Sequence, residues 1–221
     1  MAIWYGNSSL PLSCHFHREF QITAVLKGCR RFLTATGVVT VGAGEALVIP
    51  PGLPHQAIGL EAERTLNLNF YLTPEGLPLR RNTIIVRTPC WLQTGLSVDS
   101  PTLIDWIHDA LERSGEDSFD AASVSVANAL PSNEPRIADI ASTRGMSREG
   151  FIRSFRRSVG MTPHAYRLAF RLNRARELLA ANVTPAQAAA DAGFADQSHM
   201  GRHFRRSFGV TPGIYRCAVR T

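Results

Sequence analysis

The first ninety residues contain short runs in which apolar and polar side chains alternate. These runs cover residues 20–26, 32–34 and 38–41, and glycines at positions 28, 37, 42 and 44 interrupt them. A period of two is that of a strand with one buried face, and glycine is common in the tight turns between strands. This half of the chain is predicted to be a β domain of short antiparallel strands.

After residue 100 the apolar positions recur every three or four residues, which is the period of a helix with one buried face. In residues 101–130 the apolar stripe consists of Leu103, Trp106, Ile107, Ala110 and Leu111. In residues 164–181 it consists of Leu168, Leu172, Ala175 and Leu179. Polar residues at 114–120 and 131–135 predict a loop and an inter-domain linker. The pattern therefore predicts an α+β chain with an all-α domain after the β domain.

A thirteen-residue phrase occurs twice near the C-terminus. Residues 155–167 read FRRSVGMTPHAYR and residues 204–216 read FRRSFGVTPGIYR, so that nine positions are identical at an offset of 49. A match of this length at a fixed offset indicates that one structural unit is present in two copies.

The residues in front of each copy have the pattern of a helix-turn-helix unit. Ala141 precedes Gly145 by four positions, and Ala189 precedes Gly193 by the same distance. A small residue lets a second helix cross closely, and glycine can adopt the positive φ that a tight turn between helices needs. Two helix-turn-helix units are therefore predicted.

Each predicted turn is followed by an N-cap residue, Ser147 or Asp196, and then by a short helix with two different faces. The inward faces carry Phe151, Phe155, Met200 and Phe204. The outward faces carry Arg148, Arg153, Arg156 and Arg157 in the first unit, and Gln197, Ser198, His199, Arg202, Arg205 and Arg206 in the second. A solvated basic surface is the simpler interpretation. Gln, Ser, His and Arg on the first turns of a helix are also the side chains that read base edges.

The charge is divided unevenly between the two halves. Before Asn133 the chain has 9 Lys and Arg against 12 Asp and Glu, a formal charge of −3. From Asn133 onward it has 15 against 6, a formal charge of +9. The C-terminal half is therefore the part expected to meet a polyanion.

The second unit resembles the C-terminal signature of the AraC/XylS transcription regulators. The resemblance rests on residues 193–199, GFADQSH, and on Arg202, Phe204, Gly209, Thr211, Pro212 and Tyr215. It extends over residues 133–216 and implies a DNA-binding domain with two helix-turn-helix units joined by a long helix at 164–181. Recognition helices on one rod are expected to enter major-groove segments about 34 Å apart on one side of the duplex.

By position, this resemblance implies which side chains meet DNA. The base-reading set is Arg148, Glu149, Ile152 and Arg153 in the first unit, and Gln197, Ser198, His199 and Arg202 in the second. The phosphate-binding set is Arg156, Arg157, Arg205 and Arg206. The second unit is chemically better equipped for base reading, because Ile152 offers only an apolar contact with a thymine methyl group.

Residues 44–55 resemble the second cupin motif, G-x5-P-x-G-x2-H, and residues 15–19, HFHRE, loosely resemble the first. The implied fold is a small cupin-like β-barrel, the usual sensor domain of these regulators, and such folds can enclose a pocket. His15, His17 and His55 are the candidate residues of a pocket for an organic effector.

The same three histidines could instead converge on a metal ion, because two histidines and a carboxylate with open positions suit iron. Glu19 follows His17 too closely for the usual cupin spacing, and the ligand expected shortly after His55 is absent. We therefore expect no metal and no cofactor.

The expected domains are a sensor barrel at 1–95, a helical dimerisation segment and linker at 96–132, and the DNA-binding domain at 133–221. By resemblance, the helix within 101–130 forms a homodimer interface through Leu103, Trp106, Ile107 and Leu111, although the same stripe could pack on the barrel. The expected partners are double-stranded promoter DNA, an unidentified small-molecule effector and, for an activator, RNA polymerase.

No run approaches 18 apolar residues, and the first ten residues lack a charged start followed by an apolar stretch. A cytoplasmic protein without a membrane partner is therefore expected.

Three other functions stay open at this point. The chain could be a constitutive DNA binder with a vestigial barrel, or a metal-dependent cupin enzyme fused to a DNA-binding module. It could also be a DNA-repair alkyl acceptor, but that chemistry needs a cysteine cluster, and Cys14, Cys29, Cys90 and Cys217 are scattered. We assign no catalytic residue and expect no enzyme activity.

Overall fold

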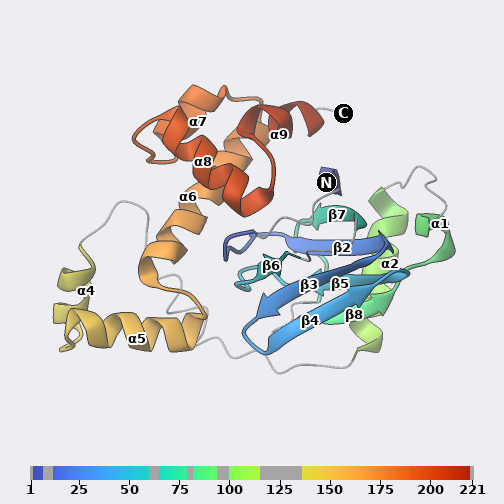
Figure 1. Cartoon of the computed structure of the whole chain (residues 1–221), viewed down its shortest axis with the longest axis horizontal. Helices are drawn as coiled ribbons and strands as arrows, with labels where there is room; N and C mark the ends of the chain where they lie inside the picture. Colours follow the sequence, from blue (N-terminus) through green and yellow to red (C-terminus); the bar gives the residue numbers. More distant parts are fainter. Residues whose placement is uncertain are drawn as a thin grey trace. The chain divides into compact units, whose positions relative to one another are not determined.

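A computed structural model describes residues 2–6, 12–59, 65–78, 82–93, 100–114 and 136–219. The chain forms two compact units, Met1–Phe119 and Asp120–Arg220, and each is described by itself. Figure 1 shows the strands of the first unit and the helices of the second. The predicted order of a β domain followed by an all-α domain is confirmed.

The first unit contains two antiparallel sheets. The five-stranded sheet has the order β1 (Ala2–Gly6), β7 (Leu66–Leu72), β2 (Phe20–Lys27), β5 (Glu45–Ile49) and β8 (Ile84–Arg87). The three-stranded sheet has the order β4 (Gly37–Gly42), β3 (Cys29–Thr34) and β6 (Gln56–Ile58). Strands β3 and β4 form a hairpin, whereas the other neighbouring strands are distant in the sequence, as in the double-sheet jelly roll.

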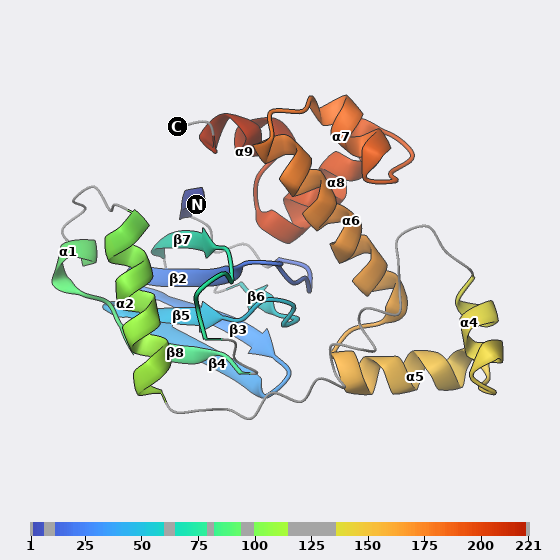
Figure 2. The same ribbon diagram turned by 180° about the vertical axis from the view of Figure 1, so that it is seen from behind.

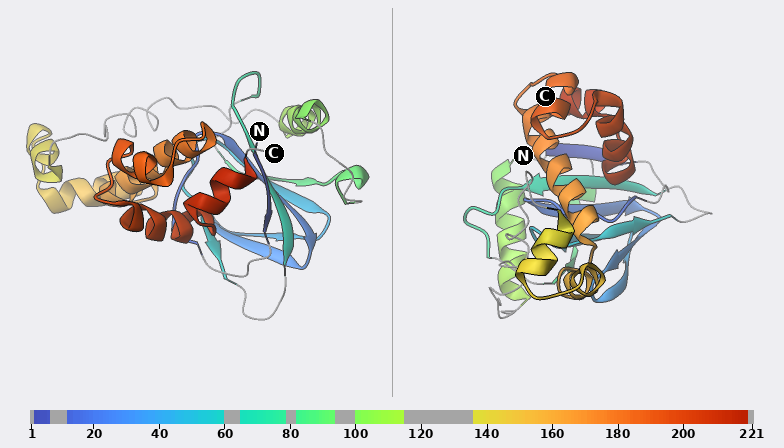
Figure 3. Two further views of the ribbon diagram at one scale, coloured as in Figure 1. Left: turned by 90° about the horizontal axis from the view of Figure 1, so that it is seen from above. Right: turned by 90° about the vertical axis from the view of Figure 1, so that its left-hand side faces the viewer.

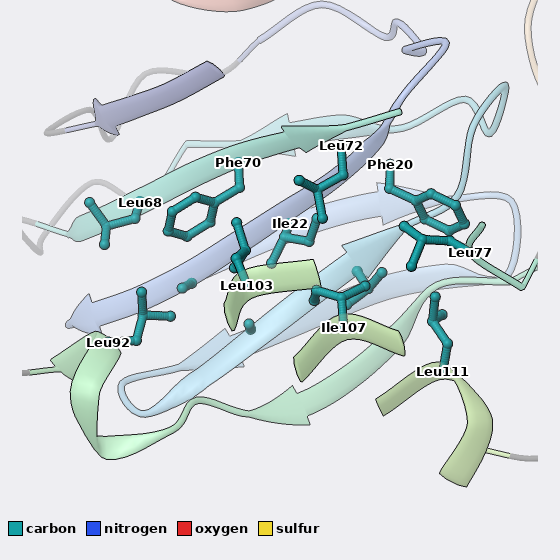
Figure 4. Packing of buried hydrophobic residues seen from close by; sticks show 13 residues of the cluster. Phe20, Ile22, Leu68, Phe70, Leu72, Leu77, Leu92, Leu103, Ile107 and Leu111 are labelled. Carbon is teal, nitrogen blue, oxygen red and sulfur yellow. The ribbon is translucent and has the colours of Figure 1, made fainter. Parts of the chain in front are cut away.

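The two faces of the five-stranded sheet are covered differently because side chains alternate along each strand. One face packs against helix α2 (Ser100–Arg113), which lies along the sheet in Figures 2 and 3. Figure 4 shows this core, in which Phe20, Ile22 and Phe70 of the sheet meet Leu103 and Ile107 of α2. These five side chains have 0% exposure, and burial of each contributes about 1.5–3 kcal/mol relative to an exposed position.

The opposite face of this sheet packs against the three-stranded sheet. The side chains that meet there are Val25, Leu47 and Ile49 from the larger sheet and Phe32, Val41 and Ala57 from the smaller one. Each is at most 2% exposed, so this part of the interior is filled by the protein's own side chains.

The apolar stripe of α2 is buried against the five-stranded sheet of the same chain. Leu103, Ile107 and Leu111, which the sequence analysis assigns to a dimer interface, have 0% exposure and belong to the sheet core, and Trp106 is half-buried beside it. The segment 96–132 is predicted as a separate helical segment and linker, and its helix α2 packs on the first unit; residues 115–135 lie outside the described residues. Helix α1 (Cys90–Gln93) precedes it.

The second unit is helical. Its described helices are α4 (Ile137–Thr143), α5 (Arg148–Val159), α6 (Pro163–Ala180), α7 (Pro185–Asp191), α8 (Gln197–Phe208) and α9 (Pro212–Ala218). Helix α6 is the predicted long helix, and it contacts α5, α7, α8 and α9. In the part of the chain that the structure describes, no helix has both the length and the apolar character needed to cross a bilayer.

The turns between α4 and α5 and between α7 and α8 have the predicted backbone. Gly145 and Gly193 have φ values of 64° and 77°, in the region that favours glycine. The duplicated phrase itself forms helix ends. Gly160 and Gly209 are left-handed C-caps of α5 and α8, and the threonine before each following proline is the N-cap of the next helix.

The duplication extends to the packing. The ring centroids of Phe155 and Tyr166 are 5.7 Å apart, and those of Phe204 and Tyr215, the equivalent pair, are 5.6 Å apart. The phrase is therefore a scaffold that ends one helix, starts the next and fastens both through an aromatic pair.

Candidate DNA interface and sensor site

Helices α5 and α8 each bury one face and expose the other. The buried side chains are Phe151 and Phe155 in α5, and Met200, Phe204 and Ser207 in α8. The exposed residues include those predicted to meet DNA, namely Arg148, Glu149, Arg153, Arg156, Arg157, Gln197, Ser198, Arg202, Arg205 and Arg206. Ile152 and His199 are half-buried. The structure thus presents two separate sets of polar side chains on two similar helices.

The first turn of each helix is fixed by its predicted N-cap. The Ser147 hydroxyl accepts a hydrogen bond from Gly150 N at 3.1 Å, and Asp196 Oδ1 accepts one from His199 N at 2.7 Å. The remaining amides at a helix N-terminus favour an anionic group such as a phosphate. Each first turn is therefore closed by a side-chain cap, and its other amides can face a phosphate.

The two helices differ in their first turns. In α5 the Arg148 guanidinium lies 3.5 Å from the Glu149 carboxylate, so the two charges partly offset each other. In α8 the first turn has no acidic residue and starts with Gln197 and Ser198, which can donate to and accept from base edges. This difference favours α8 as the helix with more groups for base reading.

His199 is held by its neighbours. Its ring centroid lies 5.7 Å from that of Phe194 in the turn and 4.9 Å from that of His203 on the next turn of α8. Burial lowers the pKa of His203, and the nearby His199, Arg206 and Arg202 lower it further. The His203 imidazole therefore lies beside cationic arginine side chains of α8 and not alone.

The paired arginines lie at the other end of each helix. Arg156 and Arg157 are in the last turn of α5, and Arg205 and Arg206 are in the last turn of α8. A cation in the last turn also stabilises a helix by interacting with its dipole. Their exposed position is compatible with both this structural role and phosphate contact.

In the first unit, the three candidate histidines come together. The ring centroid of His15 lies 4.8 Å from that of His17 and 4.5 Å from that of His55, and the His17 and His55 centroids are 5.3 Å apart. All three side chains are at most 3% exposed. Residues from two segments almost forty positions apart thus form one buried cluster.

The backbone holds these segments side by side. His15 N donates to His55 O at 3.0 Å and His55 N donates to His15 O at 2.8 Å, while Gly52 N donates to His17 O at 2.7 Å. Burial lowers the pKa of His55 to about 4, so its imidazole is neutral at pH 7. The cluster is therefore a preformed group with at least one uncharged imidazole.

A chain of polar side chains that was not predicted from the sequence leads from this cluster along the inner face of the larger sheet. His55 Nε2 lies 3.0 Å from Gln21 Oε1, Gln21 Nε2 donates to Thr23 Oγ1 at 3.0 Å, and Thr23 Oγ1 donates to Asn69 Oδ1 at 2.7 Å. The polar residues at positions 21 and 23, between apolar neighbours, were the available signal.

Two further inward-facing residues were also missed. The His17 ring lies 4.9 Å from the Tyr71 ring. Arg30 is 8% exposed on β3, and its guanidinium carbon lies 5.9 Å from the centroid of the Phe32 ring. Burial lowers the pKa of Arg30, and Tyr71 opposes that shift. The apolar interior thus has a polar end that contains histidine, tyrosine and arginine.

Comparison with known families accounts for both units. The family model of the AraC-like ligand-binding domain matches residues 13–125, and that of a helix-turn-helix domain matches residues 140–218. The chain belongs to the AraC-type family of regulators. The first match includes the histidine cluster and α2, and the second includes α5 and α8.

Individual proteins that resemble this AraC-type chain match it over a short stretch or at low sequence identity. It is 42% identical over 62 residues to the uncharacterised HTH-type transcriptional regulator YbfI of Bacillus subtilis, a match that covers 28% of this chain and 22% of that relative. The chain therefore aligns with about a fifth of the curated relative's length.

Two solved structures of ToxT from Vibrio cholerae share the AraC-type fold over nearly the whole chain. ToxT with a bound unsaturated fatty acid is 13% identical, with a TM-score of 0.62 and coverage of 98% of this chain and 94% of ToxT. ToxT bound to (E)-4-(8-methylnaphthalen-1-yl)but-3-enoic acid is 11% identical, with a TM-score of 0.60 and coverage of 99% and 98%. At this identity the likeness concerns the fold.

Proposed function

We propose that this AraC-type chain is a sequence-specific DNA-binding transcription regulator controlled by a small ligand of its N-terminal domain. The observation that carries the proposal is the pair of capped helices α5 and α8, each with a buried aromatic face and an exposed face of base-reading and cationic side chains. Both lie in the half of the chain with a formal charge of +9.

In this proposal α5 and α8 enter successive major-groove segments of promoter DNA. Gln197, Ser198 and Arg202 of α8 read bases, with Arg suited to guanine and Gln to adenine. Arg148, Glu149, Ile152 and Arg153 of α5 supply a second and chemically different reading surface, and His199 contributes from the edge of α8. The paired arginines at 156–157 and 205–206 bind phosphates and set the register without reading sequence.

The first unit is the proposed sensor. Its family match and its buried polar end, with His15, His17 and His55, support binding of a small molecule there. The fold likeness to ToxT, which was solved with bound organic acids, is in line with this role. Ligand binding changes DNA affinity only if the ligand prefers one arrangement of the protein.

Dimerisation and the remaining partners are also proposals. The side chains of Leu103, Ile107 and Leu111 are buried in the sheet core. A homodimer formed through α2 would therefore use Trp106 and the outer residue Ile104, which is 41% exposed. Light scattering of the purified protein measures its oligomeric state directly.

An activator would in addition contact RNA polymerase. We place the protein in the cytoplasm, where promoter DNA is found, and assign it no enzymatic role.

The test is an electrophoretic shift with DNA from upstream of the protein's own coding region, at several salt concentrations. Arg202→Ala is expected to lose discrimination between target and scrambled DNA, by about 1–3 kcal/mol. Arg205→Ala is expected to weaken both to the same extent and to reduce the salt slope by about 1.

Arg113→Ala is the matched control, because Arg113 is an exposed arginine of the first unit that pairs with Asp109 at 3.4 Å. It removes the same charge and is expected to leave DNA binding unchanged. If the wild-type protein shifts no DNA at low salt, or if Arg113→Ala acts like Arg202→Ala, the proposed interface is wrong. Binding that no ligand ever changes would favour the constitutive regulator instead.

A further inference from the structure

Helix α6 has a basic face that is not part of the interface proposed for α5 and α8. Its buried face packs in the helical core through Leu172, Ala175 and Leu179. The outer face carries histidine or arginine at intervals of three, four and three residues, which the helical period places in one narrow row. These residues are exposed or half-buried, and we call them the α6 row: His164, Arg167, Arg171 and Arg174.

The α6 row contains no acidic side chain. Glu177 is the only acidic residue of α6, and it lies beyond the end of the row, where its carboxylate is 3.3 Å from the Arg174 guanidinium. Arg176 belongs to the other face, because it is 4% exposed and its guanidinium carbon lies 5.6 Å from the centroid of the Phe208 ring. Helix α6 thus keeps one arginine for the core and presents the others outward.

The row borders the second reading unit at two places. Helix α8 packs on α6 (Figures 1 and 2). The Arg171 side chain lies on the turn before α8, since a Cβ built on Gly193 would be 3.6 Å from Arg171 Nε and 3.9 Å from its Cδ. His164 lies near α8 itself: burial lowers the pKa of His203, and His164 is among the neighbours that lower it further. The α6 row therefore adjoins the surface of α8 that carries Arg202.

The environment of Arg171 favours an anion. Its Nε–H is buried and, within the described ranges, meets no hydrogen-bond acceptor. A guanidinium stays charged at physiological pH, and packing against the Gly193 turn removes part of its hydration. An anion at the terminal nitrogens would offset this cost, and a phosphate matches the planar fork of donors.

The length of the row suits a DNA strand between the two reading helices. From position 164 to position 174 an α-helix rises about 15 Å, and a DNA strand carries about four phosphates over that length. Helix α6 joins the two helix-turn-helix units. When their recognition helices enter successive major-groove segments, the element that joins them faces the intervening backbone and not base edges.

We propose that the α6 row is a third DNA-contacting surface, which binds phosphates of the strand between the two major-groove segments. This inference rests on the proposed function, because it requires that both reading helices engage one duplex. The row adds affinity without sequence preference, because phosphates carry no sequence information. The intervening base pairs are therefore free to vary.

The test measures the salt dependence of DNA binding by the full-length protein, with DNA from upstream of its coding region and with scrambled DNA. The logarithm of the affinity falls by about 0.9 per bound phosphate for each tenfold rise in salt, so one contact contributes roughly 8-fold at 0.1 M relative to 1 M salt. Arg167→Gln and Arg171→Gln are each expected to lower the affinity for both DNAs by about this factor and to reduce the salt slope by about 1.

Two further variants separate phosphate binding from a structural role. Arg171→Lys keeps the charge but loses the planar group that lies on the turn, so it is expected to retain the salt slope. Glu177→Gln removes the carboxylate that offsets Arg174 and is expected to strengthen binding to both DNAs. Damage to the fold cannot produce such a gain.

Arg174→Gln and Arg113→Gln form a matched pair, because each arginine is exposed and lies close to a carboxylate of its own helix, at 3.3 Å and 3.4 Å. Only Arg174→Gln is expected to reduce the salt slope, since Arg113 belongs to the first unit. Circular dichroism shows whether each variant is folded. If Arg171→Gln does not fold, the variants at positions 174 and 177 still decide.

Salt slopes of the three glutamine variants in α6 that equal the wild-type slope would overturn the α6 row, and so would an equal loss of slope in Arg113→Gln. If Arg171→Lys loses as much affinity and slope as Arg171→Gln, Arg171 positions the turn and does not bind a phosphate. Unchanged slopes together with lost discrimination in Arg202→Ala contradict the α6 row and leave the proposed function standing. A wild-type protein that binds neither DNA at low salt contradicts both.

Discussion

Two glycines, one inside α8 and one in the turn before it, allow one chemical change with opposite expected effects. Gly201 lies inside α8, where a built Cβ meets no atom within 4 Å. Gly193 lies in the turn before α8 with a φ of 77°. A Cβ at Gly193 would lie 3.6 Å from Arg171 Nε, an ordinary contact, so the backbone and not a clash decides its effect.

The magnitudes follow from these conformations. Alanine is favoured over glycine within a helix by about 0.8–1.0 kcal/mol, so Gly201→Ala is expected to raise the free energy of unfolding by about that amount. Alanine with a positive φ costs about 1–2 kcal/mol, so Gly193→Ala is expected to lower it. The two variants are expected to differ by about 2–3 kcal/mol.

The assay is thermal unfolding followed by calorimetry. For a domain of this size about 1 kcal/mol corresponds to roughly 4–8 °C in Tm, so Gly201→Ala is expected to melt above the wild type and Gly193→Ala below it. The chain has two units, so the transition of the second must be assigned first, and His55→Gln, which changes the first unit, serves for this. Equal Tm values for both variants, or a lower Tm for Gly201→Ala, would refute the assignment of these backbone conformations.

Two further predictions concern the same helix. Asp196→Ala removes the acceptor of His199 N and is expected to cost about 1 kcal/mol of stability, measured by chemical denaturation, whereas Asp196→Asn, which can still cap, is expected to cost less; equal losses would contradict the capping role. Arg202→Ala is expected to raise the pKa of His203, because it removes one of the charges that lower it, although burial remains the largest cause. An NMR titration of the His203 ring protons that shows no upward shift would contradict the arrangement of charges on α8.

The turns, the two N-caps and the long helix of the second unit could be predicted from the sequence. The positive φ of Gly145 and Gly193, the N-caps Ser147 and Asp196 and the long helix that follows Thr162 are all present. Each depends on residues within one or two helical turns. An N-cap side chain accepts a hydrogen bond from the amide three residues ahead, and glycine is needed where its own φ is positive. The duplicated phrase then indicated that the same arrangement of helix ends occurs twice.

The exposed faces of α5 and α8 could also be predicted, because the period of a helix assigns each residue to a face. The partner of each exposed residue could not. That Arg148 lies beside Glu149, and that His199 packs against Phe194 and His203, depends on side-chain positions across a turn.

In the β domain, the sequence predicts the strands but not how distant segments pack together. Local alternation predicted its strands, but the apolar stripe of α2 is compatible with both a dimer interface and a sheet, and only the tertiary structure shows it against Phe20, Ile22 and Phe70. The same holds for the histidines. His15 and His17 come from one segment and His55 from another, and only the tertiary structure brings their ring centroids to within 5.3 Å of one another. Local sequence determines caps, turns and faces because they need only near neighbours. Pairing between segments forty residues apart depends on which strands meet, and only the complete tertiary structure determines this.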